Sequence, residues 1–271
     1  MKQKIVHLIL CLFLCSLNGF SQGLPHTDFL RIKLGYIEQV DSYLSPLIYD
    51  GTYIGLSNEW FQPLRKKKQY IEKWSHEGGF EAGFAKLYNP MKSNAIRAYY
   101  LHTEWGPLYK AVDIQNFHLF VSPIVNFDWH FRFQINNVNK PFSTDVGLDL
   151  SAFLKLDYTI VRKKKYRFNY DLKWNVVGTD YLLDYWQSYY EVANEIDNET
   201  DNIGKNWRLA GLWNRQNIKQ EFSVDFIFNK VGVKVGINHN YNHTFGKNIT
   251  MERNMVNLVV GLIFCYEYKT L

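Results

Sequence analysis

The chain contains very little cysteine. Of its 271 residues three are cysteine, and two of them, Cys11 and Cys15, lie in an N-terminal segment that we expect to be removed on export. Cys265 would then be the single cysteine of the mature protein, so no intramolecular disulfide can form. This excludes the small secreted folds that depend on several disulfides.

Long hydrophobic runs and an excess of one charge are also lacking. No stretch approaches the roughly 20 apolar residues that a membrane-spanning helix requires. The 31 basic and 26 acidic residues give a net charge of +5, which is too small to indicate a nucleic-acid partner. With 46% hydrophobic and 17% aromatic residues, the chain is too apolar to be disordered. The composition is therefore that of a folded domain.

The first residues have the pattern of a secretory signal peptide. Lys2 and Lys4 form a positive segment, residues 5–17 form an apolar run, and Gly19 and Ser21 are small residues before an expected cleavage site. The apolar run is too short to span a bilayer. We therefore expect residues 1–21 to be a signal peptide and residues 22–271 to form the mature domain.

The mature chain alternates between apolar and polar residues with a period of two, the spacing of a β-strand with two unlike faces. Residues 125–134 show it most clearly. Apolar Val125, Phe127, Trp129, Phe131 and Phe133 alternate there with polar Asn126, Asp128, His130, Arg132 and Gln134. Similar alternation predicts strands at residues 27–38, 49–61, 77–88, 94–105, 114–134, 144–161, 166–177, 217–228, 231–241 and 253–268.

These strands predict an all-β fold, an antiparallel transmembrane β-barrel of about 10 strands (8 to 12). The predicted connections include a long one at residues 62–76 on the side of the termini and a much longer one at residues 178–216 on the other side. Pro123 lies within a predicted strand, where it implies a bulge or a break into two strands.

Alternation alone does not say which face lies inside. A soluble barrel that binds an apolar ligand places its apolar face inward, whereas a membrane barrel places it outward. The strands exceed the roughly five or six residues usual in soluble proteins, and a face of large aromatic residues on every strand would overfill a small barrel. Both features favour the membrane barrel, and the soluble periplasmic barrel remains the alternative.

The polar faces carry many charges of both signs. They predict an inward charge network that either plugs the lumen, which we favour, or lines a conduction path or ligand site. The candidate residues are Asp128, His130, Arg132, Asp149, Lys155, Asp157, Arg167, Asp171 and Lys173.

The long connection at residues 178–216 combines aromatic and acidic side chains. A cap over the barrel mouth explains them, and so does a surface that binds a glycan or a protein partner. Its candidate residues are Tyr185, Trp186, Tyr189, Tyr190, Glu191, Trp207 and Trp213. Membrane lipid is the other partner that we expect.

The sequence contains few motifs typical of catalytic or ligand-binding sites. The eight histidines show no metal-ligand spacing and no phosphate-binding loop is present, so we expect no metal, no cofactor and no catalytic residue. The enzyme alternative is a lipid-modifying, phospholipase-like barrel. It would use His239 among Asn238, Asn240 and Asn242, with Ser122 or Ser143 as the nucleophile.

Three short motifs resemble a family of uncharacterised Bacteroidota outer-membrane proteins. They are Tyr43-Leu44-Ser45-Pro46-Leu47 followed by Tyr49 and Gly51, Asn136-Asn137-Val138-Asn139-Lys140-Pro141, and Gln187-Ser188-Tyr189-Tyr190-Glu191. The resemblance covers roughly residues 30–268 and implies an outer-membrane β-barrel without a known activity. We expect a non-enzymatic structural or surface-interaction protein of the cell envelope.

Overall fold

A computed structural model describes residues 26–66, 69–134, 136, 141–161, 165–183, 206–228, 231–246 and 248–266. Eleven strands occupy most of these residues, and among them no helix is long and apolar enough to cross a membrane. The strands are β1 (His26–Asp41), β2 (Ser45–Lys66), β3 (Gln69–Tyr88), β4 (Ala95–Ile114), β5 (Phe117–Phe133), β6 (Phe142–Val161), β7 (Lys165–Leu182), β8 (Trp207–Gly211), β9 (Arg215–Phe228), β10 (Val231–Gly246) and β11 (Ile249–Tyr266).

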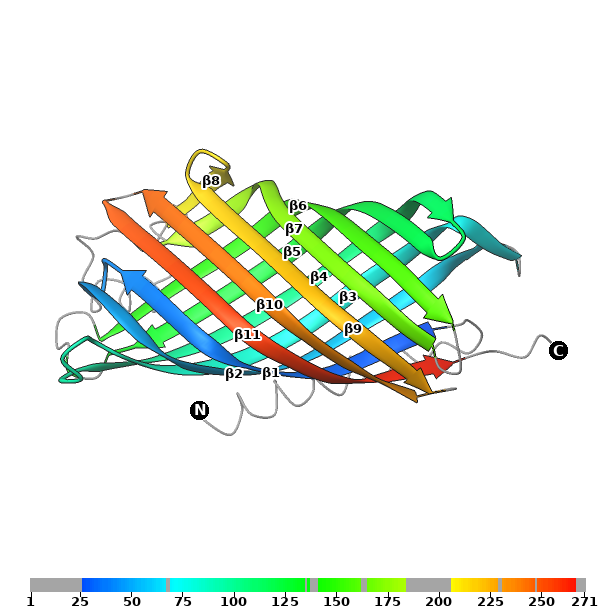
Figure 1. Cartoon of the computed structure of the whole chain (residues 1–271). Helices are drawn as coiled ribbons and strands as arrows, with labels where there is room; N and C mark the ends of the chain where they lie inside the picture. Colours follow the sequence, from blue (N-terminus) through cyan, green and yellow to red (C-terminus); the bar gives the residue numbers. More distant parts are fainter. Residues whose placement is uncertain are drawn as a thin grey trace, which may run out of the picture.

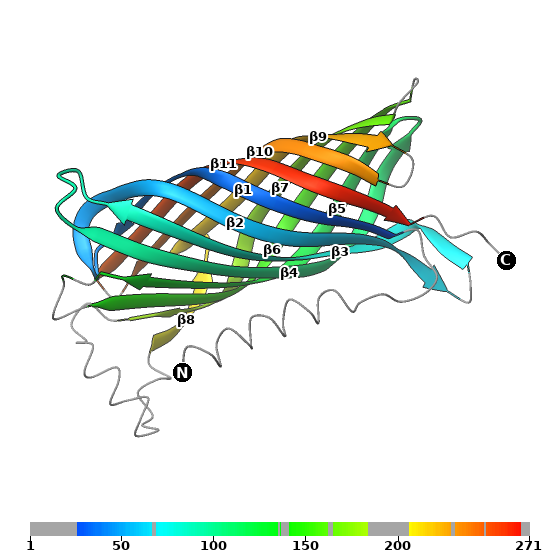
Figure 2. The same ribbon diagram turned by 90° about the horizontal axis from the view of Figure 1, so that it is seen from below.

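The strands form a closed antiparallel barrel (Figures 1 and 2). Each strand from β1 to β7 pairs with the next, β7 pairs with β9, and β9, β10 and β11 follow in order. The first strand closes the barrel on the last, with His26 opposite Tyr266. We call this end of the barrel the termini end and the opposite end the loop end.

Strands β8 and β9 together form one strand of the wall. Both pair with β7, which contacts β9 along Lys165–Trp174 and β8 along Val177–Tyr181. A turn at residues 212–214 separates them, and its Asn214 accepts a hydrogen bond from the Gly211 N–H at 2.8 Å and donates one to the Leu209 carbonyl at 2.9 Å. The barrel therefore has ten strands, which confirms the predicted fold class.

The strands extend further than the apolar alternation predicts. Strand β2 ends at Lys66 and β3 begins at Gln69, with Pro63 paired to Ser75, so the long connection predicted at residues 62–76 is wrong. Similarly, β4 continues to Ile114. The prediction ended each strand where its apolar face ended, but ladder hydrogen bonds continue where both faces are polar.

Pro123 causes neither the bulge nor the break into two strands that the sequence predicts as alternatives, although the pairing of β5 with β4 lapses beside it. Strand β5 is continuous and pairs with β6 through Pro123 and Ala152. The pairing is irregular instead between β5 and its other neighbour, β4. There the register shifts between Lys110 and Val112, and the pairing lapses between the Trp105–Val125 and Tyr109–Val121 pairs.

Apolar side chains point out of the barrel and polar ones point into its lumen. On β1, Ile32 and Leu34 are 48% and 49% exposed, whereas the alternate residues Arg31 and Lys33 are 2% and 5% exposed. The same alternation of buried polar and exposed apolar side chains follows β5 over residues 125–130. This is the arrangement of a membrane barrel and the reverse of the soluble barrel that binds an apolar ligand inside.

The lumen is charged in its middle and partly apolar toward both ends. At the loop end, a cluster that includes Ile37, Tyr49, Tyr53, Leu87 and Met255 is buried. At the termini end, a smaller cluster contains Leu108, Phe120, Ile124 and Phe153, with Phe61 packed against it. The central charged layer thus lies between two apolar clusters, and further ion pairs, such as Arg132 with Asp41 at 2.9 Å, lie beside the loop-end cluster.

Candidate functional site

The central charged layer is the largest polar constellation among the described residues. It is built from inward positions of strands that lie around the whole barrel, because a period of two places every second side chain in the lumen. Two ion-paired groups within it, one around Arg31 and one around His102, define its geometry.

Arg31 on β1 joins three strands. Its Nη1 donates to both carboxylate oxygens of Glu221 on β9, at 2.9 and 3.0 Å, and its Nε donates to Ser57 Oγ on β2 at 3.1 Å. The Nη2 group donates to Glu59, also on β2. A planar guanidinium suits such a site because it presents several donors in a fixed geometry.

His102 on β4 lies between two carboxylates. Its Nδ1 is 2.9 Å from Asp128 Oδ1 on β5, and its Nε2 is 3.1 Å from Glu104 Oε2. The Nζ of Lys219, from β9, lies 3.4 Å from the same Asp128 oxygen. The contact between Lys219 and Asp128 spans part of the lumen, because β9 is separated from β5 by β6 and β7.

Two lysines on neighbouring strands complete the layer. Lys155 on β6 donates to Glu77 on β3 at 2.6 Å. Lys173 on β7 donates to Glu104 and lies 3.8 Å from Glu77. Cations and carboxylates therefore interlock, and the partners of opposite sign offset the cost of taking these paired charges out of water.

Little space remains inside this network. The cavity within it measures about 40 Å³, and its lining includes His102, Asp171, Lys173 and Glu221. Small-molecule sites usually measure roughly 300–1,000 Å³, so this cavity accommodates water at most. The arrangement can neutralise charges and hold strands together, and it leaves no room for a substrate.

The structure divides the predicted charge network into three groups. Asp128, Asp149, Lys155, Asp171 and Lys173 belong to the central layer, where Asp149 pairs with Arg215 at 3.1 Å. His130 and Arg132 lie nearer the loop end and both contact Asp145. Asp157 and Arg167 line a separate cavity of about 280 Å³ at the termini end.

The sequence analysis missed about two thirds of the central layer. Its other members come from strands with weaker alternation, although their polar residues also recur at every second position. These residues are Arg31, Lys33, Glu59, Glu77, Glu81, His102, Glu104, Arg215, Lys219, Glu221 and Lys234.

The groups of the enzyme alternative do not come together. His239 points outward and its Nε2 lies 2.8 Å from Asn254 Oδ1. Ser122 and Ser143 are buried on the lumen side of β5 and β6, and Ser143 accepts a hydrogen bond from Arg132 at 3.2 Å. Across the described part of the chain, no three His, Cys, Asp or Glu side chains are placed to hold a metal ion.

The predicted surface of the long loop is described only in part. Tyr185, Trp186, Tyr189, Tyr190 and Glu191 lie outside the described residues. Trp207, which begins β8, is 44% exposed and packs edge-on against Tyr181 at 5.7 Å. Trp213 in the following turn is 59% exposed. Both tryptophans lie near the loop end.

Comparison with solved structures places this architecture among outer-membrane barrels. The outer membrane protease OmpT of Escherichia coli aligns over 92% of this chain and 98% of its own, with 8% identity and a TM-score of 0.54. The β domain of the Bordetella autotransporter BrkA covers 89% of this chain and all of its own at 9% identity, with a TM-score of 0.42. At such identities the likeness concerns the fold alone.

Sequence comparison gives a family without an activity. No curated protein matches the chain. Residues 26–268 match the family described as "Protein of unknown function (DUF3316)". Because this match covers most of the chain, the protein belongs to that family.

Proposed function

We propose that this chain is an outer-membrane β-barrel protein with a closed lumen, which acts as a structural or surface-interaction protein and not as an enzyme. Residues 1–21 would direct its export in a Gram-negative cell, and the resemblance stated above points to a Bacteroidota source. The observation that carries the proposal is the interlocked charge layer, with its 40 Å³ cavity, inside a wall whose outer face is apolar.

The outer face supports a membrane location. Along β11, Val256, Leu258, Val260 and Leu262 are 44% to 50% exposed, and equivalent apolar rows follow the neighbouring strands. Monomeric soluble proteins rarely expose apolar patches larger than a few hundred Å². Acyl chains would cover this belt, and the ladder hydrogen bonds of the closed barrel satisfy the backbone where water is absent.

The three layers of the lumen support a closed barrel. A solute that entered from the loop end would first meet Tyr49, Tyr53 and other buried side chains of the apolar cluster. It would then meet paired charges that fill the cross-section of the lumen, such as Arg31 with Glu221. Passage would require these ion pairs to break without compensation, and breaking a buried pair costs roughly 3–5 kcal/mol.

The loop end supports a role in contact with a partner. Trp207 and Trp213 present exposed indole rings there, and aromatic side chains are enriched where proteins bind partners. We propose a surface glycan or another protein as the partner of this end.

Fractionation, a heat-modifiability gel and planar-bilayer recording together test the proposal. We expect the mature protein in the outer-membrane fraction, an unboiled band that migrates apart from the boiled one, and no conductance steps above the lipid background. A protein released by osmotic shock without detergent would refute the membrane location, and stable conductance would refute the closed lumen.

A lipid-modifying activity is tested separately. Purified protein in detergent should not hydrolyse phospholipid or lipopolysaccharide. Turnover that is lost in His239→Ala but retained in His243→Ala, a second histidine on the outward face of β10, would establish the enzyme instead.

A further inference from the structure

Two prolines face each other in the barrel wall. The register of β4 and β5 is the same on both sides of the lapse in their pairing, with Trp105 opposite Val125 and Tyr109 opposite Val121. Pro107 is therefore directly opposite Pro123. Neither residue has an N–H to donate, and the lapse is centred on this pair. We call residues 106–108 and 122–124 the proline seam.

Ser122 replaces part of the missing ladder. Its hydroxyl lies 2.9 Å from the Pro123 carbonyl oxygen and is also within hydrogen-bonding distance of the Pro107 carbonyl oxygen. Only the contact with Pro107 crosses from β5 to β4, so the two strands are joined less tightly here than along the rest of their pairing. Gly106 permits their close approach, because a Cβ there would lie 2.5 Å from the Pro123 oxygen.

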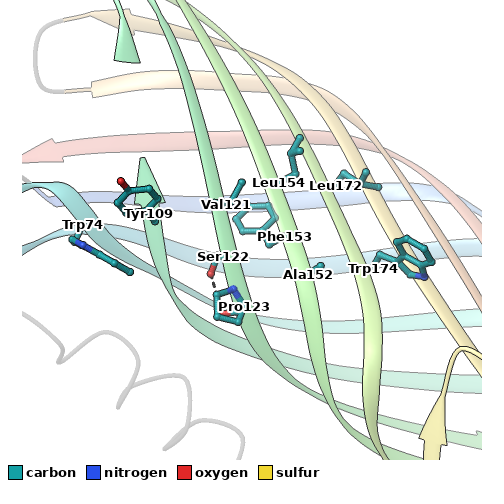
Figure 3. Close-up of a pocket in the computed structure, with 10 residues that line it drawn as sticks. All are labelled: Trp74, Tyr109, Val121, Ser122, Pro123, Ala152, Phe153, Leu154, Leu172 and Trp174. Atoms are coloured by element: carbon teal, nitrogen blue, oxygen red, sulfur yellow. Dashed lines mark hydrogen bonds between the residues drawn. The ribbon is translucent and has the colours of Figure 1, made fainter. Parts of the chain in front are cut away.

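An apolar groove lies on the outer surface over the proline seam (Figure 3). It measures about 660 Å³, within the roughly 300–1,000 Å³ of ligand sites. Pro123 and Ala152 give it a shallow floor, and Trp74, Tyr109 and Trp174 stand around it. The remaining lining residues are Val121, Ser122, Phe153, Leu154 and Leu172.

The groove runs along the lipid-facing belt in the half of the barrel nearer the termini end. Trp74 and Tyr109, whose ring centroids are 5.0 Å apart, lie near the ends of their strands, where aromatic girdles meet lipid headgroups. Ala152 and Trp174 lie further into the belt. The inner side of the same wall is also apolar, because Leu108, Ile124 and Phe153 form the cluster behind the seam.

We propose that this groove is a specific binding site for one acyl chain of a membrane phospholipid, with the headgroup end of the chain at Trp74 and Tyr109. A hydrocarbon chain is apolar, as the lining of the groove is. It could extend from the aromatic girdle into the lipid-facing belt, and acyl chains surround this face of a membrane barrel. The surface beneath the chain is low, since Pro107, Pro123 and Ala152 occupy outward positions of the wall where larger side chains would fill the groove. The inference rests on the proposed membrane location.

A photoactivatable lipid tests the site. The full-length mature protein is reconstituted in dioleoylphosphatidylcholine vesicles that contain a trace of phosphatidylcholine with a diazirine in one chain, and adducts are mapped by mass spectrometry after illumination. We expect adducts concentrated on residues 121–123 and 152–154, in excess over the outward residues of β1 and β11.

Two matched variants separate a site from ordinary lipid contact. Ala152→Trp fills the groove and should remove the concentrated adducts, whereas Leu148→Trp, on the same outward face of β6 but outside the groove, should retain them. Both variants should keep the heat-modifiable band. Adducts spread evenly around the belt, or equal adducts in the two variants, would overturn the site. Loss of the band in the unsubstituted protein would instead overturn the membrane barrel.

Discussion

Replacing Arg31 by methionine should strongly destabilise the barrel. The guanidinium is 2% exposed and holds Glu221 and Glu59, which are 7% and 17% exposed. Methionine fills a similar volume but leaves both carboxylates without their main partner. Breaking a buried ion pair costs roughly 3–5 kcal/mol. Lys234 remains 3.6 Å from Glu221, so we expect the lower part of this range, about 3 kcal/mol.

Urea titration in detergent micelles, with the folded fraction read from the heat-modifiable band, measures this loss. Ile32→Met is the matched control, because it changes the adjacent outward residue and conserves volume, which usually costs less than about 1.5 kcal/mol. The double variant Arg31→Met with Glu221→Met removes both partners of the Arg31–Glu221 pair. It should recover part of the stability, since replacing both charges by apolar groups is often close to neutral.

Two outcomes would contradict this account of Arg31. If Arg31→Met loses no more stability than Ile32→Met, the central layer does not hold the strands together. If the double variant is as unstable as the sum of its two single variants, Arg31 and Glu221 are not energetically coupled, and their short contact contributes nothing measurable to stability.

Three further changes test other parts of the barrel. Leu258→Arg, in the middle of the outer face of β11, should cost roughly 2–4 kcal/mol in lipid vesicles, and an unchanged urea midpoint would contradict the lipid-facing assignment. Phe153→Ala should cost roughly 3–5 kcal/mol by leaving a cavity in the termini-end cluster, measured in the same titration. Pro107→Val combined with Pro123→Val should stabilise the wall by roughly 0.5–1.5 kcal/mol for each restored ladder bond, and hydrogen exchange should show the two new amides protected.

The strongest alternation in the sequence was enough to predict the wall. Residues 125–134 carry five apolar and five polar side chains in strict order, and no helix places them on two faces. Strand ends were harder to predict. The β2–β3 hairpin continues through Pro63 and Arg65 with a shift in register, and nothing in the local apolar pattern marks that continuation.

Only about a third of the central layer was predicted, because its contacts depend on closure of the barrel. Arg31 and Glu221 are 190 positions apart in the chain, and they meet because β1 closes on β11 and the wall continues through β10 to β9. Periodicity says that Arg31 points inward. Which carboxylate it meets depends on the register of three ladders, and one residue of slip would turn a whole strand inside out.

The proline seam lies in front of an apolar part of the lumen. A wall that lacks two ladder donors is most easily parted there, and in lipid an exposed backbone carbonyl finds no water to replace its partner. Behind the seam lie Leu108, Ile124 and Phe153, so an acyl chain that pressed between the strands would meet apolar side chains. Had the seam been level with His102 and Asp128, the same motion would expose buried charges to hydrocarbon, at a far greater cost. The apolar layer at the termini end therefore makes the weak part of the wall compatible with a membrane, and it separates the lipid-binding groove from the ion pairs that hold the barrel closed.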